Sequence, residues 1–155
     1  MKSHENCSRK ELEAYIGIEA QKPFFSKALD IYTKNPNTPI WNFAAFFLTI
    51  FWFMYRKSLI LSLLVCIVLL VLSTSLPIYI SSVLLILIYV LMGLFGTNLY
   101  LHFAEKEINK LRDFNYMTDE NEFLKKISSR GGTSFVQPTI LYLILVLFLG
   151  VLLFK

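Results

Sequence analysis

Charged residues are absent from two long stretches of this chain. No Asp, Glu, Lys or Arg occurs in residues 58–104, and a second uncharged run covers residues 131–154. A single helix over the first run would be about 70 Å long, more than twice the roughly 30 Å hydrocarbon core of a bilayer. The first run must therefore fold back on itself, and the pattern predicts an integral membrane protein.

A polar turn divides the first uncharged run into two predicted helices. Residues 73–77 read Ser-Thr-Ser-Leu-Pro, and proline interrupts a helix because it lacks a backbone N–H. We expect helices at about 58–72 and 77–101 that form a hairpin, the second long enough to tilt in the bilayer. The run near the C-terminus predicts a further span over residues 134–154, with Lys155 able to snorkel at its far end.

The aromatic segment 42–55 decides the predicted topology. It would form a helix of only about 21 Å, which is too short to cross a bilayer. Arg56 and Lys57 follow it directly, and basic residues gather on the cytoplasmic side of a membrane protein. If the segment dips in and returns, or lies in the interface, every basic residue except Lys155 is cytoplasmic. We therefore expect three transmembrane helices plus one re-entrant or interfacial aromatic helix, with the N-terminus inside and the C-terminus outside.

The polar N-terminal segment, residues 1–39, predicts short cytoplasmic helices. Ser8 and Glu11 have the spacing of a capping box, so a helix should run from about 9 to 20. Pro23 suits the first turn of a second helix. That helix carries an apolar stripe, which either lies on the membrane surface or packs against the protein's own helices. The stripe consists of Phe24, Ala28, Leu29 and Tyr32.

Residues 105–133 form a charged connection with equal numbers of basic and acidic residues. We expect a break at residues 113–117 and then a short helix with Thr118 as N-cap, closed by Gly131 and Gly132. The chain thus divides into cytoplasmic helices at 1–39, the aromatic segment and hairpin at 40–104, the charged cytoplasmic loop at 105–133 and the last span at 134–155. The predicted fold class is an all-α integral membrane protein with short amphipathic cytoplasmic helices.

Composition narrows the chemistry. The chain has 155 residues, of which 55% are hydrophobic, which fits one small membrane domain without a soluble enzyme core. We expect no cleavable signal peptide and no disulfide, because Cys7 and Cys66 would lie in different compartments. His4 and Cys7 provide at most two metal ligands without a second pair. No motif for a nucleophile, a metalloprotease helix or a phosphate loop occurs, so we predict no catalytic residues, no metal and no cofactor.

Aromatic and basic residues around the short segment are the first candidates for a contact site. They can hold anionic lipid or a partner, since each basic residue near an anionic surface contributes about 1 kcal/mol. The alternative is an ordinary aromatic and basic belt at the membrane interface. This group consists of Trp41, Trp52, Tyr55, Arg56 and Lys57.

A second set of candidates lies on the long helix of the hairpin. Gly93 and Thr97 form a small-xxx-small pair that lets another helix approach closely, and Asn98 is polar within the same helix. His102 can titrate near neutral pH or bind a headgroup, and it can also simply mark the interface. The apolar segments contain no Asp or Glu, which argues against a proton-coupled transporter. The lone Arg-Gly-Gly at 130–132 gives no reason to expect nucleic-acid binding.

Several of these residues resemble a known family. The run 41–47 (Trp-Asn-Phe-Ala-Ala-Phe-Phe), then Trp52 and Tyr55-Arg56-Lys57, resembles the signature of the bacterial small membrane proteins catalogued as domain of unknown function 2628. Gly96, Asn98, Tyr100 and His102 are similar to its later pattern, and residues 131–134 to its closing glycine pair. The resemblance covers most of residues 24–134. It implies a bacterial inner-membrane protein without an assigned activity.

Three functions remain open from the sequence. We favour a non-enzymatic accessory or regulatory membrane protein that engages lipids or a membrane or cytoplasmic partner protein through its cytoplasmic face. The alternative is a small transport or channel component, which would need a homo-oligomer to enclose an aqueous path. An intramembrane enzyme is third, with His102, Asn98 and Arg56 as its participants.

Overall fold

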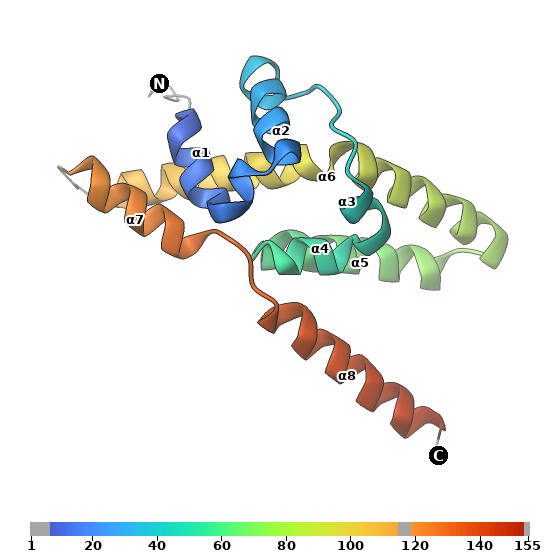
Figure 1. Ribbon diagram of the computed structural model, residues 1–155. Helices are drawn as coiled ribbons and strands as arrows, with labels where there is room; N and C mark the ends of the chain where they lie inside the picture. The colour runs from blue at the N-terminus through green and yellow to red at the C-terminus, as the bar shows by residue number, and fades with distance from the viewer. Residues whose placement is uncertain (1–6, 115–118, 154–155) are drawn as a thin grey trace.

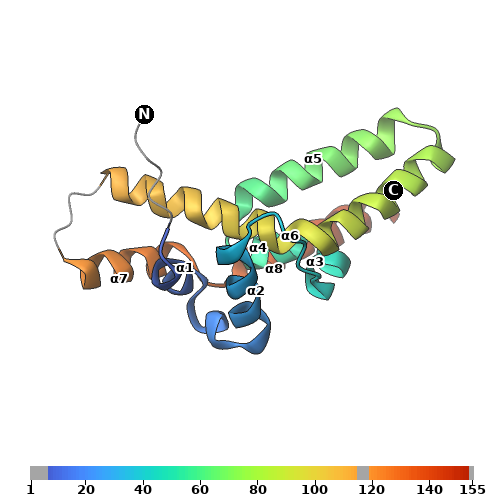
Figure 2. The same cartoon turned by 90° about the horizontal axis from the view of Figure 1, so that it is seen from above.

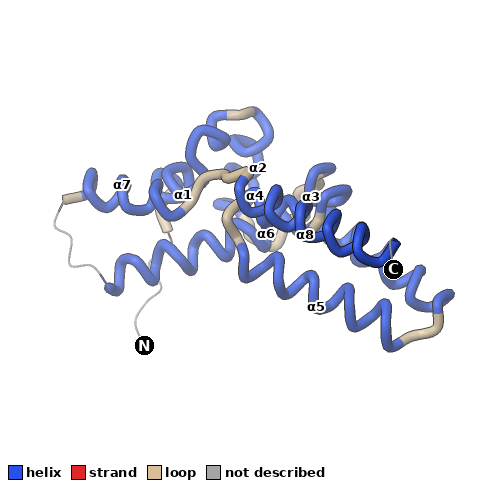
Figure 3. Tube along the Cα trace, turned by 90° about the horizontal axis from the view of Figure 1, so that it is seen from below, coloured by secondary structure: helices blue, strands red, loops and turns tan. Residues whose placement is uncertain are grey.

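The structure is a computed structural model that describes residues 7–114 and 119–153, and these residues are helical without any strand (Figure 3). The elements are α1 (Arg9–Ile16), η1 (Gly17–Gln21), α2 (Pro23–Lys34), α3 (Phe43–Leu48), α4 (Ile50–Tyr55), α5 (Leu59–Ser75), α6 (Ile78–Phe114), α7 (Glu120–Arg130) and α8 (Val136–Leu153). The expected all-α class is therefore confirmed.

The N-terminal helices begin as the sequence predicts. Ser8 and Glu11 form the capping box at the start of α1, because the Ser8 N–H donates to Glu11 Oε2 at 2.7 Å and the Glu11 N–H donates to Ser8 Oγ at 3.3 Å. The helix expected to reach residue 20 changes to 3-10 geometry at Gly17, whose φ is +74°. In α2, Ala28, Leu29 and Tyr32 of the expected stripe are buried and face the chain's own helices. Phe24 is 38% exposed, so its place in the stripe is wrong, and the neighbouring Phe25 is buried instead.

The aromatic segment is a broken helix. Asn42 caps α3, since its Oδ1 accepts the Ala45 N–H at 3.1 Å while its Nδ2 donates to Thr97 Oγ1 at 3.0 Å. The continuous helix expected over 42–55 is wrong at Thr49, which has a φ of +35° and separates α3 from α4. The Thr49 hydroxyl donates to the Phe46 carbonyl at 3.1 Å. Such a local side-chain bond competes with continuation of the helix.

Helices α5 and α6 form the predicted hairpin (Figures 1 and 2). With 37 residues, α6 is about 55 Å long, and it runs past the expected end at residue 101 without a break. Within the described residues, α6 is the one helix long and apolar enough to cross a membrane, and 11% of its apolar window is buried in the chain. Because α5 has only 17 residues, the three expected spans stay a prediction.

The chain enters and leaves the aromatic segment beside the same turn of α6. On the way in, Asn98 Nδ2 donates to the carbonyls of Pro36 at 2.7 Å and Thr38 at 2.8 Å. The chain then runs along α6, where the Asn42 N–H donates to the Gly93 carbonyl at 2.8 Å. On the way back, the Trp52 ring lies 5.8 Å from the ring of Tyr100. The segment therefore reverses its direction along α6.

Small residues on α6 make room for this segment. A Cβ atom at Gly93 would lie 3.0 Å from the Trp41 ring, and one at Gly96 would lie 3.0 Å from the Ala45 Cβ. Both distances are shorter than ordinary carbon contacts. The glycines thus allow the aromatic segment to pack directly against the helix backbone.

The polar helices gather around the C-terminal half of α6 (Figures 1 and 2). Leu12, Leu29, Ile108 and Ile127 are buried there, each from a different helix. An ion pair of 2.6 Å between Arg112 Nη2 and Glu11 Oε1 links α6 to α1.

The capping and pairing of these helices have particular electrostatic consequences. Burial acts to raise the pKa of Glu11, but hydrogen bonds from Arg112 and Ser8 outweigh the effect of burial, so the pKa of Glu11 is lowered.

The N-cap of α7 is Asp119, whose Oδ1 accepts the Asn121 N–H at 3.0 Å. The expected cap, Thr118, and most of the expected break at 113–117 lie outside the described residues.

Helix α8 leaves this body beside α4 and projects away from it (Figure 1). The Ser134 N–H donates to the Tyr55 carbonyl at 2.8 Å, and the rings of Tyr55 and Phe135 lie 4.8 Å apart. The start of α8 is thus fixed at the same end of the hairpin as Arg56.

Two glycines directly after α7 pack against the backbone of α1. The Gly132 N–H donates to the Tyr15 carbonyl at 2.6 Å. A Cβ atom on Gly131 would lie 2.0 Å from that same carbonyl oxygen. Because no real Cβ approaches an oxygen so closely, the crossing of these two segments requires glycine at position 131.

We predict that Gly131→Ala lowers the free energy of unfolding by about 1–3 kcal/mol, because the added methyl group overpacks the crossing. Thermal unfolding in detergent, followed by circular dichroism, measures the change. The control is Ser129→Ala on the exposed face of α7, which should stay within about 0.5 kcal/mol of the parent protein. Equal stability of the two variants would contradict the crossing.

Candidate functional site

A single buried arginine lies where the N-terminal helices meet the hairpin. The side chain of Arg56 is 4% exposed, and its Nη2 lies 3.5 Å from Glu19 Oε2 of η1. Glu19 also pairs with the exposed Lys22 at 2.5 Å. Burying a guanidinium costs several kcal/mol unless an opposite charge and further contacts compensate. The surroundings of Arg56 must therefore supply that compensation.

Aromatic rings supply much of the compensation for burying the Arg56 guanidinium. The Arg56 Cζ atom lies 4.2 Å from the ring centroid of Phe25, 5.7 Å from those of Tyr55 and Tyr100, and 5.8 Å from that of Trp52. A cation over an aromatic face gains about 0.5–2 kcal/mol when desolvated. Together with Glu19, these four rings form the Arg56 cage. Its members come from η1, α2, α4 and α6, so the cage joins the polar helices to the hairpin.

Polar atoms within the cage remain without a partner. Arg56 Nε and Nη1 and the Tyr100 hydroxyl are buried and have no hydrogen bond among the described residues. A guanidinium stays charged and donates hydrogen bonds without exchanging protons. The cage can therefore hold an acceptor such as water or an oxyanion. Its one carboxylate, Glu19, is paired with Arg56 and Lys22.

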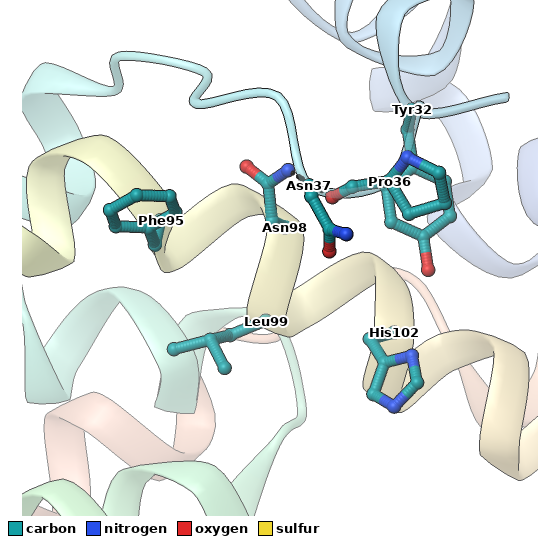
Figure 4. A pocket seen from close by; sticks show the side chains of 7 residues that line it. All are labelled: Tyr32, Pro36, Asn37, Phe95, Asn98, Leu99 and His102. Atoms are coloured by element: carbon teal, nitrogen blue, oxygen red, sulfur yellow. Dashed lines mark hydrogen bonds between the residues drawn. The ribbon is translucent and has the colours of Figure 1, made fainter. Parts of the chain in front are cut away.

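A pocket of about 420 Å³ opens between α6 and the turn after α2, on the side of α6 away from the cage (Figure 4). We call it the α6 pocket. Asn98 fixes the turn through its two hydrogen bonds to backbone carbonyls, while its own Oδ1 is buried without a partner among the described residues. The lining residues are Tyr32, Pro36, Asn37, Phe95, Asn98, Leu99 and His102.

Polar groups converge at one end of this pocket. The Tyr32 hydroxyl donates to Glu105 Oε2 at 3.0 Å, and His102 Nδ1 lies 3.9 Å from the same oxygen. Figure 4 shows the Tyr32 hydroxyl and the His102 ring at this end. Burial, followed by the charge of Glu105, raises the pKa of Tyr32. The phenol therefore stays protonated and acts as a hydrogen-bond donor.

A second hollow, of about 690 Å³, lies between the α1–η1 corner and α7. We call it the α1–α7 groove. Its most unusual member is Ile18, which is 88% exposed. The other residues that line it are Glu13, Ala14, Gly17, Gln21, Asn121, Leu124, Lys125 and Ser128. Ile18 therefore presents a large apolar side chain to solvent at this groove.

The structure separates the aromatic and basic candidates. Trp52, Tyr55 and Arg56 come together in the cage, where Trp52 and Arg56 are buried. Trp41 lies against Gly93 and is 39% exposed. Lys57 follows the cage with a φ of +55° and is partly exposed.

The candidates on α6 also fall into two places. Thr97 accepts the hydrogen bond from Asn42, and Gly93 faces the aromatic segment of the same chain. Asn98 and His102 line the α6 pocket. The packing surface and the pocket therefore lie on different sides of one helix.

Sequence analysis missed three members of the cage, namely Glu19, Phe25 and Tyr100 in its role as a partner of Arg56. A buried arginine needs a compensating carboxylate, but the sequence does not mark Arg56 as buried. The N-terminal segment offers several carboxylates, and spacing cannot select among them.

No metal site is found in the part of the chain that the structure describes. Cys7 donates to Glu11 Oε2 at 3.4 Å, and burial followed by the charge of Glu11 raises the pKa of its thiol. A protonated thiol is a poor ligand and a poor nucleophile. His4, the other residue of the expected pair, lies outside the described residues.

Over the described residues, the fold and its buried arginine define a helical protein with one helix long and apolar enough to cross a membrane and a polar helical end packed onto it. The chain belongs to the family described as protein of unknown function (DUF2628), whose model matches residues 15–106. That range contains every member of the Arg56 cage and the whole α6 pocket. No curated protein and no solved structure matches the chain.

We predict that Glu19→Gln lowers the free energy of unfolding by about 3 kcal/mol, because it leaves the Arg56 guanidinium buried without a carboxylate. Glu13→Gln is the matched control, since Glu13 forms an exposed pair with Arg9 and should cost less than about 1 kcal/mol. Chemical unfolding in detergent measures both changes.

A double-mutant cycle isolates the pair. In an Arg56→Met background, Glu19→Gln should change stability by less than about 0.5 kcal/mol, because no buried cation remains to be compensated. An equal loss in both backgrounds would show that Glu19 acts independently of Arg56.

Proposed function

We propose that this chain is a small bacterial inner-membrane protein with a non-enzymatic accessory or regulatory role, and that its polar helices engage a partner protein on the cytoplasmic side. The observation that carries the proposal is the division of the chain into two parts. The hairpin presents exposed apolar side chains, while the polar helices pack together at one end around Arg56.

The proposed topology has three spans and a re-entrant aromatic segment. Two observations support the re-entrant segment, which starts and ends beside the same turn of α6, near Asn98 and Tyr100. Arg56, Lys57 and the polar helices then share one side, in accord with the excess of basic residues expected in the cytoplasm. Helix α8 starts from that side beside Tyr55, which would carry the C-terminus outside.

The α1–α7 groove is the proposed contact for the partner. Ile18 is exposed in η1, beside α1 and α7, whose own large apolar side chains are buried or partly buried. Burying one such side chain in an interface contributes about 1.5–3 kcal/mol. The contact would therefore suit a reversible regulatory partner.

Cysteine labelling tests the topology. With Cys7 and Cys66 replaced, a membrane-impermeant maleimide should label Ser75→Cys in intact spheroplasts, because residue 75 lies at the hairpin turn. Lys34→Cys and Lys57→Cys should react only after permeabilisation. Labelling of position 57 in intact spheroplasts, with position 75 protected, would mean that the aromatic segment spans the membrane.

Affinity purification tests the function. A tagged chain, extracted in lipid-preserving polymer, should retain a stoichiometric partner that is lost in Ile18→Asp, because a carboxylate cannot fill the apolar contact. The control is Ser129→Asp, on α7 outside the groove. Retention by both variants would contradict the groove.

A flux assay addresses the competing function. The accessory proposal requires that the purified chain in liposomes pass ions and small solutes no faster than empty liposomes. Flux above that background, carried by a homo-oligomer, would favour a transport or channel component instead.

A further inference from the structure

One face of α6 changes from apolar to basic along its length. Phe95, Leu99, His102 and Lys106 follow each other at spacings of three and four residues, so they lie on the same face of the helix. Phe95 is 37% exposed and Leu99 is 40% exposed. His102 and Lys106 are also exposed. This face therefore presents an apolar half followed directly by a basic half.

Two hollows adjoin along this face. The α6 pocket of about 420 Å³ contains Phe95 and Leu99, and His102 lies at its other end (Figure 4). A second hollow of about 520 Å³ continues from His102 towards Asp113, lined by His102, Glu105, Lys106, Asn109, Lys110 and Asp113. Because both contain His102, they form one continuous amphipathic surface.

The basic groups on this surface are available to a ligand. Neither Lys106 nor Lys110 forms an ion pair within residues 7–114 and 119–153. Glu105, in contrast, is engaged by the Tyr32 hydroxyl at 3.0 Å. Asp113 lines the hollow as well, so the formal charges of its two lysines and two carboxylates balance. Lys106 and Lys110 are nevertheless exposed cations outside any ion pair of the described residues, and lysine and imidazole N–H groups donate charge-assisted hydrogen bonds to a phosphate group.

The spacing of the two halves matches the layers of a bilayer. His102 lies about 4.5 Å beyond Leu99 along the helix and Lys106 about 10.5 Å beyond it. The headgroup layer on each side of the hydrocarbon core is about 5–7 Å thick. When Leu99 lies at the edge of the hydrocarbon, the His102 ring lies in the headgroup layer, and the flexible Lys106 side chain can reach down into it.

We propose that this surface binds one phospholipid, with the lipid phosphate held by His102 and Lys106 and an acyl chain lying over Phe95 and Leu99. Asn37, whose side chain lines the pocket, closes the site above the glycerol region. The proposal rests on the proposed function in one respect only, namely that α6 lies in a bilayer.

Native mass spectrometry with added phosphatidylglycerol tests the site. The parent chain should retain one lipid, and the double variant His102→Gln, Lys106→Gln should bind it at least tenfold more weakly. The double variant Lys27→Gln, Lys125→Gln removes two exposed lysines elsewhere and should stay within twofold of the parent. Equal retention by the two double variants would overturn the proposal.

Two further arms identify the ligand and guard against misfolding. Glycerol phosphate, the headgroup without its acyl chains, should fail to displace the lipid at equal concentration; displacement would mean that the site recognises free phosphate. With Cys7 and Cys66 replaced, Asn37→Cys carrying a photoreactive maleimide should cross-link to phospholipid in liposomes and leaves both basic residues intact. Absence of that cross-link would also overturn the proposal.

Failure of the lipid site and failure of the proposed function give different results. A chain that does not sediment with membranes would refute the membrane role itself. A chain that is embedded, with the labelling pattern given above, yet binds phosphatidylglycerol equally in all variants would refute only the lipid site.

Discussion

Burial of the Arg56 guanidinium is the constraint on which this fold depends. The charge lies under η1 and α2 and against α6, so those elements must be in place before its desolvation is compensated by Glu19 and the four rings. Breaking a buried ion pair commonly costs 3–5 kcal/mol, which is a large part of the total stability of a small domain. The arginine thereby couples the packing of the polar helices to the correct path of the aromatic segment. Lys57, one residue later, lies outside the cage and carries no such role.

Local patterns were the predictable part of the fold. The capping box at Ser8, the proline start of α2 and the hairpin turn before α6 all follow from short-range rules, and the structure contains each of them. The break at Thr49 was missed because a single threonine in an apolar aromatic run is only a weak signal against a continuous helix. The continuation of α6 beyond residue 101 was missed for the opposite reason, since a change from apolar to charged composition does not end a helix whose backbone propensity continues.

The candidate site was predictable only where its residues are neighbours in sequence. Trp52 and Tyr55 lie on α4 and Arg56 is its C-cap, so these three were recognised together. Glu19, Phe25 and Tyr100 reach the cage through tertiary packing that spacing cannot encode. The α6 pocket was predictable to the same limited extent. Asn98 and His102 were recognised, but Tyr32 and Asn37 arrive there because Asn98 binds the carbonyls of the turn after α2.

The crossing of Gly131 and Gly132 over Tyr15 has a consequence for biosynthesis. Domains generally begin to fold from the N-terminus while the ribosome is still adding residues. Here α1 is made first, yet its carbonyl at Tyr15 receives its partner only after residue 132 has emerged. The polar end of the molecule therefore completes its packing only shortly before α8, which starts at Val136, is made. A nascent chain that stalls before residue 131 would contain all of α7 but lack the Gly132–Tyr15 hydrogen bond that fixes the end of α7 to α1.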